Sequence, residues 1–296
     1  MNIQDRKISR RTFLKKSAYI SAASLVSTSI PYTYAKKVEP TLIQVREVGI
    51  SIPTLPADLQ GKRIVQFSDV HVGEYYSIEQ LEEAVRIINK QEADFVMFTG
   101  DLIDHFGQYK EVKKLAPALA KVQAKLGKFA IYGNHDHGGG GSRAYKEIMK
   151  EAGFDLLIND KRNVAISSDT TINIVGLDDL LLGNMEIEKT LKPIRAEEFT
   201  IVLAHEPDVA DKVKEYEVDL QLSGHSHGGQ IQLPFIGPLV TPTYAEKYVD
   251  GLYTLGGAKQ AFYLYVNRGL GTTRLPFRFL CKPEITVLTL KKGEKR

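Results

Sequence analysis

Five short polar motifs in this 296-residue sequence carry side chains that can bind a metal ion or move a proton. In chain order they are Asp69-Val70-His71, Gly100-Asp101-Leu102-Ile103-Asp104, Gly133-Asn134-His135-Asp136, Ala204-His205 and Gly224-His225-Ser226-His227. Imidazole nitrogens together with carboxylate and amide oxygens suit a divalent transition metal. The single cysteine, Cys281, provides no set of sulfur ligands. The motifs therefore predict a metal centre built from nitrogen and oxygen donors.

Each motif has an ordinary structural explanation when it is taken alone. Asp-x-His is a common surface pair at a strand end, Gly-Asn-His-Asp is compatible with a β-turn and an Asx cap, and His-Ser-His with a satisfied structural pair. All five motifs, however, directly follow apolar runs. This shared position favours one common site over five unrelated turns.

The apolar runs are typical of buried strands, because they are short, rich in β-branched and aromatic residues and bounded by turn residues. The predicted strands cover residues 63–67, 95–98, 129–132, 172–175, 199–203 and 218–222. Helices are predicted at about 77–88, with Ser77 as N-cap and Gln80 completing a capping box, at about 109–125 and at 143–152. Residues 260–267 and 284–290 are expected to be antiparallel additions. The alternation of strands and helices predicts an α/β fold whose sheet is covered on both faces.

This fold class explains why the motifs would meet. Strands of an α/β sheet present their carboxyl ends at one edge, where ligands bind. Residues i and i+2 of an extended segment point to the same side, so Asp69 and His71 are expected to reach one ion together. Glycines such as Gly224 allow the sharp bends and the close backbone approach that such a site requires.

The N-terminus predicts an export signal over residues 1–35. Ser9-Arg10-Arg11-Thr12-Phe13-Leu14-Lys15 precedes an Ala- and Ser-rich apolar stretch and a small-residue break at Ala35, the pattern of a twin-arginine signal. The alternative is a membrane anchor, but the apolar run is shorter than the ~20 residues that span a bilayer. The twin-arginine translocase is thus an expected partner. The expected location is the cell wall or the outer surface of the membrane, or the protein is secreted.

The charge of the chain argues against nucleic-acid partners. The formal net charge of +3 becomes about −2 when residues 1–35, with six basic residues and one aspartate, are set aside. No basic stripe for phosphate backbones remains. A nuclease is therefore disfavoured.

The ordered set of five motifs resembles the signature of the calcineurin-like metallophosphoesterases and spans residues 64–227. The wider chain is similar to bacterial members of that family that are exported by the twin-arginine pathway. The resemblance implies a two-sheet α-β-β-α sandwich, with residues 36–296 as the metallophosphoesterase domain. It also implies hydrolysis of phosphate mono- or diesters by a metal-bound hydroxide.

The resemblance assigns roles residue by residue. It implies two divalent ions, manganese, iron or zinc, with Asp101 bridging them and His135 as the catalytic histidine that binds no metal. The remaining ligands divide into Asp69, His71 and His227 for the first ion and Asn134, His205 and His225 for the second. Asp104 and Asp136 are candidates either to orient a histidine or to cap a helix.

Several residues near the motifs have two open interpretations. His137, Arg268 and Arg274 are candidate substrate-binding residues. The alternative for His137 is a plain flexible loop, and the alternative for the two arginines is surface charge. Arg278 likewise suits either phosphate contact or surface charge. The apolar segment 233–240 suits either contact with a lipid chain or ordinary packing.

Two other functions compete with a general phosphoesterase. Some similar proteins cleave the pyrophosphate of a UDP-linked diacylglucosamine, which would make this chain a UDP-2,3-diacylglucosamine-type pyrophosphatase. A non-catalytic, cell-wall-associated metal-binding protein is the alternative from a different class. Such a protein is expected to lack a ligand or the catalytic histidine, and none is missing here.

Overall fold

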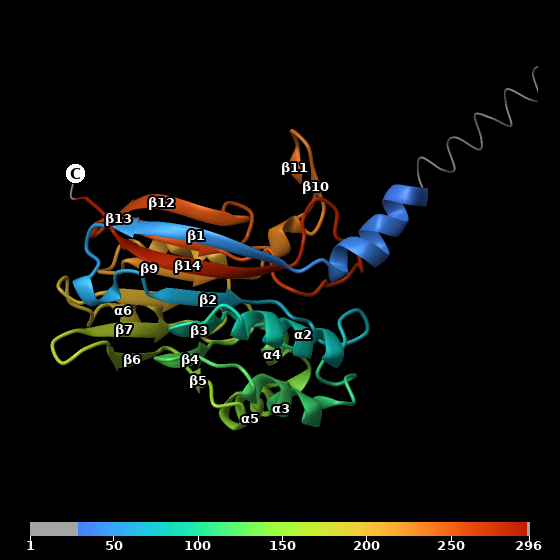
Figure 1. Cartoon of the computed structure of the whole chain (residues 1–296), viewed down its shortest axis with the longest axis horizontal. Helices are drawn as coiled ribbons and strands as arrows, with labels where there is room; N and C mark the ends of the chain where they lie inside the picture. Colours follow the sequence, from blue (N-terminus) through green and yellow to red (C-terminus); the bar gives the residue numbers. More distant parts are fainter. Residues whose placement is uncertain (1–28, 295–296) are drawn as a thin grey trace, which may run out of the picture.

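The computed structural model describes residues 29–294 and contains two six-stranded mixed sheets (Figure 1). The first sheet has the order β1-β14-β2-β3-β4-β5, and the second has the order β12-β13-β9-β8-β7-β6. The strands of the first sheet are β1 (Gln44–Ile52), β2 (Arg63–Phe67), β3 (Phe95–Phe98), β4 (Gly127–Ala130), β5 (Asp155–Leu156) and β14 (Glu284–Lys292). Those of the second are β6 (Asp160–Ala165), β7 (Thr171–Gly176), β8 (Thr200–Leu203), β9 (Leu220–Ser223), β12 (Gly251–Gly257) and β13 (Gln260–Val266).

Short helices and one small hairpin complete the fold. The α-helices are α2 (Ile78–Asn89), α3 (Leu115–Ala120), α4 (Asn134–His137), α5 (Ser142–Glu151), α6 (Ile187–Leu191) and α7 (Ala210–Val213). The hairpin pairs β10 (Gln232–Leu233) with β11 (Gly237–Pro238) and projects from the body of the molecule (Figure 1). Helix α2 begins with the predicted capping box, in which the side chains of Ser77 and Gln80 each accept from the other's backbone N–H.

Three apolar clusters define four layers. The first cluster packs α2, α3 and α5 against one face of the first sheet, where Phe67 and Phe98 stack. The second fills the space between the sheets, and the third packs the outer face of the second sheet against α6 and α7. Alternate residues of a strand serve different layers, as Phe95 and Val96 do. The predicted α/β fold, an α-β-β-α sandwich, is confirmed.

The two late strands differ from the expected antiparallel additions. Strand β13 is antiparallel to β12 but parallel to β9, and β14 is antiparallel to β2 but parallel to β1. Each is therefore an internal strand, since it has a neighbour on both sides. Strand direction depends on where the chain returns after a crossover, which the local sequence does not record.

The helix predicted over residues 109–125 is much shorter. Only Leu115–Ala120 is α-helical, after a 3-10 turn at Val112–Lys114. Pro117 explains the late start, because a proline is tolerated only within the first turn of a helix. At the other end, Asn89 of α2 binds the backbone of Lys121 and Gln123 and so ends the helix.

The N-terminal segment contacts the body of the molecule. Of the predicted export signal, residues 1–28 lie outside the described residues; residues 29–33 are helical and lead into a π-helical turn at Tyr34–Val38. Ala35 is buried and its carbonyl accepts from the backbone N–H of Arg278 at 2.9 Å. None of the helices within residues 29–294 has the length and apolar character needed to span a membrane.

Candidate metal centre

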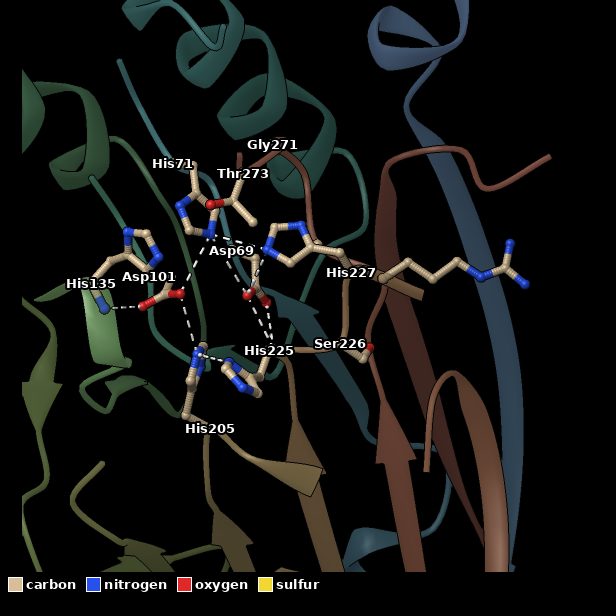
Figure 2. A network of polar contacts seen from close by, with 12 residues as sticks. Asp69, His71, Asp101, His135, His205, His225, Ser226, His227, Gly271 and Thr273 are labelled. Atoms are coloured by element: carbon tan, nitrogen blue, oxygen red, sulfur yellow. Dashed lines mark hydrogen bonds and ion pairs between the residues drawn. The ribbon is translucent and has the colours of Figure 1, made fainter. Parts of the chain in front are cut away.

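The predicted ligands meet where strands from both sheets end (Figure 2). Each lies within four residues of the last residue of a strand. Asp69 and His71 follow β2, Asp101 follows β3, Asn134 and His135 follow β4, His205 follows β8, and His225 and His227 follow β9. The site is therefore formed between the two sheets, at one common edge.

Three groups of three side chains place their ligand atoms close enough to share an ion. Two of them consist of predicted ligands alone, and the third combines His71 with Asp104 and His135. Asp69, His71 and His227 form one group, and in each group the ligand atoms all lie within 4.8 Å of one another. In the first group His227 Nε2 lies 3.4 Å from Asp69 Oδ1 and 3.1 Å from His71 Nε2. The second group consists of Asp101, His205 and His225. There, His225 Nδ1 lies 3.2 Å from His205 Nε2.

Asp101 lies between the two groups. Its Oδ2 atom is 3.4 Å from His71 Nε2 and 3.3 Å from His205 Nε2, so one carboxylate oxygen faces both. Oδ1 accepts the backbone N–H of His135 at 2.8 Å, which fixes the plane of the carboxylate. Burial opposes its charge, but the neighbouring His205 and His135 outweigh burial and hold the pKa of Asp101 well below its usual value. Asp101 is thus an anionic link between the groups.

Several features show that the site suits a cation. In each group two imidazole nitrogens face each other, at 3.1 and 3.2 Å, as ligands of a shared ion do. The amide Oδ1 of Asn134 is buried and has no hydrogen-bond partner, so it is available to accept a cation. Burial lowers the pKa of His225 to about 3, which keeps its imidazole in the neutral, metal-binding form. The donor set fits a divalent transition metal.

Backbone carbonyl oxygens and the carboxylate of Asp104 orient the imidazoles through the ring nitrogen that is not used as a ligand. His205 Nδ1 lies 2.7 Å from the carbonyl oxygen of Thr99, and His225 Nε2 lies 3.0 Å from that of Thr243. A carbonyl accepts only from a protonated nitrogen, so the other ring nitrogen is left free to bind a metal. Asp104 Oδ1 lies 3.3 Å from His71 Nδ1, so Asp104 takes the orienting role among its two alternatives.

Asp136, in contrast, binds backbone amides. It is fully buried and accepts the N–H groups of Asp101, Leu102 and Gly133 at 2.8 to 3.0 Å. It therefore joins the motif after β3 to the start of α4. Burial and the charge of Asp101 raise the pKa of Asp136 to about 7.

The backbone at the ligands is left-handed, not extended. Five of the predicted ligands have positive φ angles, between 47° and 65°: Asp69, His71, Asp101, His225 and His227. The extended i, i+2 geometry expected for Asp69 and His71 is therefore wrong, although both side chains reach one group. Hydrogen bonds to the next motif hold this turn, since the N–H groups of Asp69 and Val70 donate to Gly100 and Asp101 at 2.9 and 2.8 Å. A left-handed non-glycine residue costs roughly 1–2 kcal/mol, so the surrounding structure must enforce it.

Gly224 is required by close approach. A Cβ atom there would lie 2.0 Å from Ser68 Oγ and 2.3 Å from Asp69 Oδ2. The absence of a side chain lets the adjacent N–H of His225 donate to Asp69 Oδ2 at 3.0 Å. The glycine before His225 thus allows β9 and the turn after β2 to meet.

His135 borders the open side of the centre. Its Nδ1 lies 2.7 Å from the carbonyl oxygen of Asp104, and its side chain is 22% exposed, whereas His71 and His205 are fully buried. Burial opposes protonation, but Asp101 and the Asp104 carbonyl outweigh it and raise the pKa of His135 above its usual value. A cavity of 290 Å³, lined by Asp104, Asn134 and His135, lies in front of it. A larger hollow beside α6 contains none of the predicted ligands.

The predicted substrate-binding residues lie in different settings. Both ring nitrogens of His137 have partners, Ser142 Oγ at 3.0 Å and Asp178 Oδ1 at 2.8 Å, and the ring stacks on Tyr132. Arg268 pairs with Asp250 at 2.8 Å. These contacts favour positioning roles for His137 and Arg268, whereas Arg274 is exposed.

Arg278 is fully buried, and its guanidinium donates to backbone carbonyls of residues 268–281. Burial lowers its pKa. Its environment therefore favours neither of the alternatives predicted for it, phosphate contact or surface charge. Arg278 instead fixes the shape of the C-terminal loop.

The contact between His137 and Asp178 makes a pH-dependent contribution to stability. Its hydrogen bond to Asp178 raises the pKa of His137; burial opposes the charge of Asp178, but His137 outweighs burial and lowers the pKa of Asp178. The stabilisation from His137 is full below its unfolded pKa of about 6.5 and is lost as pH rises through the raised value. The stabilisation from Asp178 is full above its unfolded pKa of about 3.9 and is lost as the pH falls through the lowered value.

We therefore expect the coupling between His137 and Asp178 to be greatest between about pH 4 and 6.5, at about 1 kcal/mol. Denaturant unfolding of His137→Gln, Asp178→Asn and the double variant measures it as a double-mutant cycle. A coupling energy that does not change with pH would contradict the assignment.

The sequence predicted only substrate-binding arginines in the C-terminal loop, and its structural role at the first ligands was not predicted. The N–H groups of Leu270 and Gly271 donate to the carbonyls of Ser68 and Asp69 at 3.0 and 2.8 Å, which holds the turn carrying the first ligands. Thr273 and Gly271 lie beside His71 in Figure 2. The available signal was the Gly269-Leu270-Gly271 sequence, whose glycines allow this close contact.

Comparisons with known proteins agree with this geometry. The calcineurin-like phosphoesterase family matches residues 62–229, more than half of the chain. An uncharacterized metallophosphoesterase, YkuE of Bacillus subtilis, is 46% identical, with 97% of this chain and 99% of that protein covered. Phosphodiesterase YaeI of Escherichia coli is 28% identical (96% and 99% covered), and UDP-2,3-diacylglucosamine pyrophosphatase LpxG of Chlamydia trachomatis is 30% identical (89% and 94% covered). The chain therefore belongs to the calcineurin-like metallophosphoesterase family of metal-dependent phosphoric ester hydrolases.

Proposed function

We propose that this protein hydrolyses phosphate mono- or diesters at a centre that holds two divalent cations. The observation that carries this proposal is the position of Asp101 Oδ2, 3.4 Å from His71 Nε2 and 3.3 Å from His205 Nε2. One oxygen that faces two ligand groups fits a bridging carboxylate. Such a carboxylate would keep two bound ions at a fixed separation.

The remaining ligands divide between the two ions. Asp69, His71 and His227 would hold one ion, and Asn134, His205 and His225 the other. A pair of cations held there supplies Lewis acidity, which offsets phosphoryl charge and lets water act as a nucleophile near neutral pH. Manganese, iron and zinc all suit these donors. Asn134 contributes a neutral oxygen, so the centre keeps positive charge for an anionic substrate.

His135 serves as the proton donor to the leaving oxygen. Its raised pKa favours the charged imidazolium, and its position at the cavity lets it reach a bound ester. The contact between its Nδ1 and the Asp104 carbonyl leaves Nε2 to face the substrate. Positioned proton transfer of this kind contributes about 10²–10⁴ in rate.

A lipid-linked pyrophosphate is the second candidate substrate. LpxG is named for such an activity, and here the hairpin that follows His227 in the chain exposes Phe235 and Ile236. A non-catalytic, cell-wall-associated role is disfavoured, because the ligand groups and His135 are all in place. The twin-arginine motif at residues 9–15 supports export by the translocase. The protein would then act at the cell wall, on the outer surface of the membrane or after secretion.

Metal content and turnover test the proposal together. We expect the natively exported protein to contain two ions per chain by elemental analysis and to hydrolyse a soluble aryl phosphodiester. Chelation should abolish turnover, and adding manganese, iron or zinc should restore it. A fully metallated protein that cleaves none of a panel of monoesters, diesters and pyrophosphates would overturn the enzymatic assignment.

A further inference from the structure

One end of the molecule exposes an unusual number of large apolar side chains. They lie on three segments, residues 29–42, 231–240 and 273–282, which we call the apolar end face. Phe235 and Ile236, at the tip of the β10–β11 hairpin, are 108% and 71% exposed, and Val240, just after β11, is 72% exposed. The others are Ile30, Tyr32, Val38, Leu42, Leu239, Leu275 and Leu280.

Direct contacts join the three segments into one surface. Ile231 forms a β-bridge with Phe279, which connects the hairpin base to the C-terminal loop. The ring of Tyr32 packs on Phe277 at 5.3 Å. The hairpin and the N-terminal helix accordingly lie at the same end of the molecule in Figure 1. The buried guanidinium of Arg278, bound to four backbone carbonyls, stiffens the loop between them.

The exposed charges of this face are all positive. Lys36, Lys37, Arg274 and Lys282 are exposed, and the hairpin segment 231–240 contains no charged residue. The only carboxylate of the three segments, Glu39, is 1% exposed and accepts the backbone N–H groups of Leu280 and Cys281. The apolar end face therefore exposes apolar side chains and positive charges, with no exposed carboxylate on its three segments.

Backbone strain accompanies the exposure. Phe235, Arg274 and Leu280 have φ angles of 66°, 61° and 54°, in the left-handed region that bulky residues avoid. Such conformations are unfavourable for bulky residues and persist only where the surrounding structure enforces them. Here they occur at residues that carry apolar or cationic side chains to the surface.

We propose that the apolar end face docks onto an anionic lipid surface. Phe235 and Ile236 enter the boundary between headgroups and acyl chains, and the lysines and Arg274 contact lipid phosphates. A second copy of the chain is a poorer partner, because a symmetric interface would place this cationic face against itself. The docking does not depend on the proposed activity.

Docking would bring the metal centre close to the lipid. The hairpin segment begins four residues after His227, and Thr273 Oγ1 lies 3.4 Å from Asp104 Oδ1. A phosphoester of a lipid headgroup would then be within reach of the cavity. This last step rests on the proposed function, whereas the vesicle experiments below require no turnover.

The absence of tryptophan from the sequence makes the docking directly testable. In the full chain, Phe235→Trp supplies a single tryptophan at the hairpin tip, whose emission can be excited selectively over that of the tyrosines. We expect its emission to shift to the blue and intensify with phosphatidylglycerol vesicles and to change much less with phosphatidylcholine vesicles. The matched control is Leu252→Trp on β12, which replaces an exposed apolar residue outside the apolar end face and whose emission should not shift. No shift at position 235, or equal shifts with both lipids, would overturn the proposal.

A second pair of variants tests the energetics. Phe235→Ser with Ile236→Ser should weaken partitioning to anionic vesicles by at least about tenfold, because two apolar side chains no longer insert. Hydrolysis of a soluble aryl phosphodiester should stay unchanged. Unaltered partitioning would overturn the proposal. So would a wild-type dimer that the double variant dissociates, because it would assign the face to contact between copies.

Discussion

Asp101→Asn is expected to lose bound metal and activity together. The substitution keeps the shape of the side chain and an oxygen that can accept the N–H of His135, but it removes the charge that faces both ligand groups at 3.3 and 3.4 Å. Without that charge, the imidazoles of two groups lose their common anionic partner. We expect kcat/KM to fall by at least about a thousandfold, since charge stabilisation at the reacting phosphate is lost with the ions. Elemental analysis and single-substrate kinetics measure both effects.

Asp104→Asn provides a graded control for this prediction. Asp104 contacts His71 and His135 from behind and belongs to neither of the two three-residue groups around Asp101 and Asp69. Its loss should weaken metal binding or activity by about 10–100-fold, and added metal should restore full occupancy. If Asp101→Asn behaved in the same way, or kept two ions per chain, Asp101 would not be the bridge.

The meeting of the candidate ligands at one place could be predicted because its signals are local and convergent. Each motif follows an apolar run, and the carboxyl ends of such strands meet at one edge, whichever sheet they belong to. Strands β2 and β8 lie in different sheets, yet Asp69 and His205 face the same centre (Figure 2). The prediction of the site therefore did not require a correct topology.

The details that failed depend on tertiary context. Asp and His tolerate left-handed backbone better than most residues, but only the hydrogen bonds between adjacent motifs impose it at Asp69 and His71. The same holds for Arg278, whose burial depends on a guanidinium that donates to four backbone carbonyls within one loop. A sequence shows only an arginine there, and arginines are usually exposed.

The second large effect is expected for His135→Ala, and it differs in kind from the first. The ring of His135 lies at the solvent-accessible side of the centre and packs edge-on against His71, with ring centroids 4.6 Å apart. Its Nδ1 is held by the Asp104 carbonyl. The variant should therefore keep both ions and lose kcat by about 10²–10⁴. Unchanged metal content with reduced turnover separates it from Asp101→Asn. His105→Ala, which removes a 61% exposed imidazole nearby, should change kcat far less.

The leaving group and the pH profile test whether His135 donates a proton. An alkyl ester needs a proton on its departing oxygen, whereas a nitrophenyl ester leaves readily without one, so His135→Ala should impair the alkyl ester more. The active form is protonated, so wild-type activity should fall as pH rises through the raised pKa of His135, and the variant should lack this alkaline limb. Equal losses for both esters with an unchanged pH profile would make His135 a positioning residue, because proton donation alone couples the rate to the basicity of the leaving oxygen.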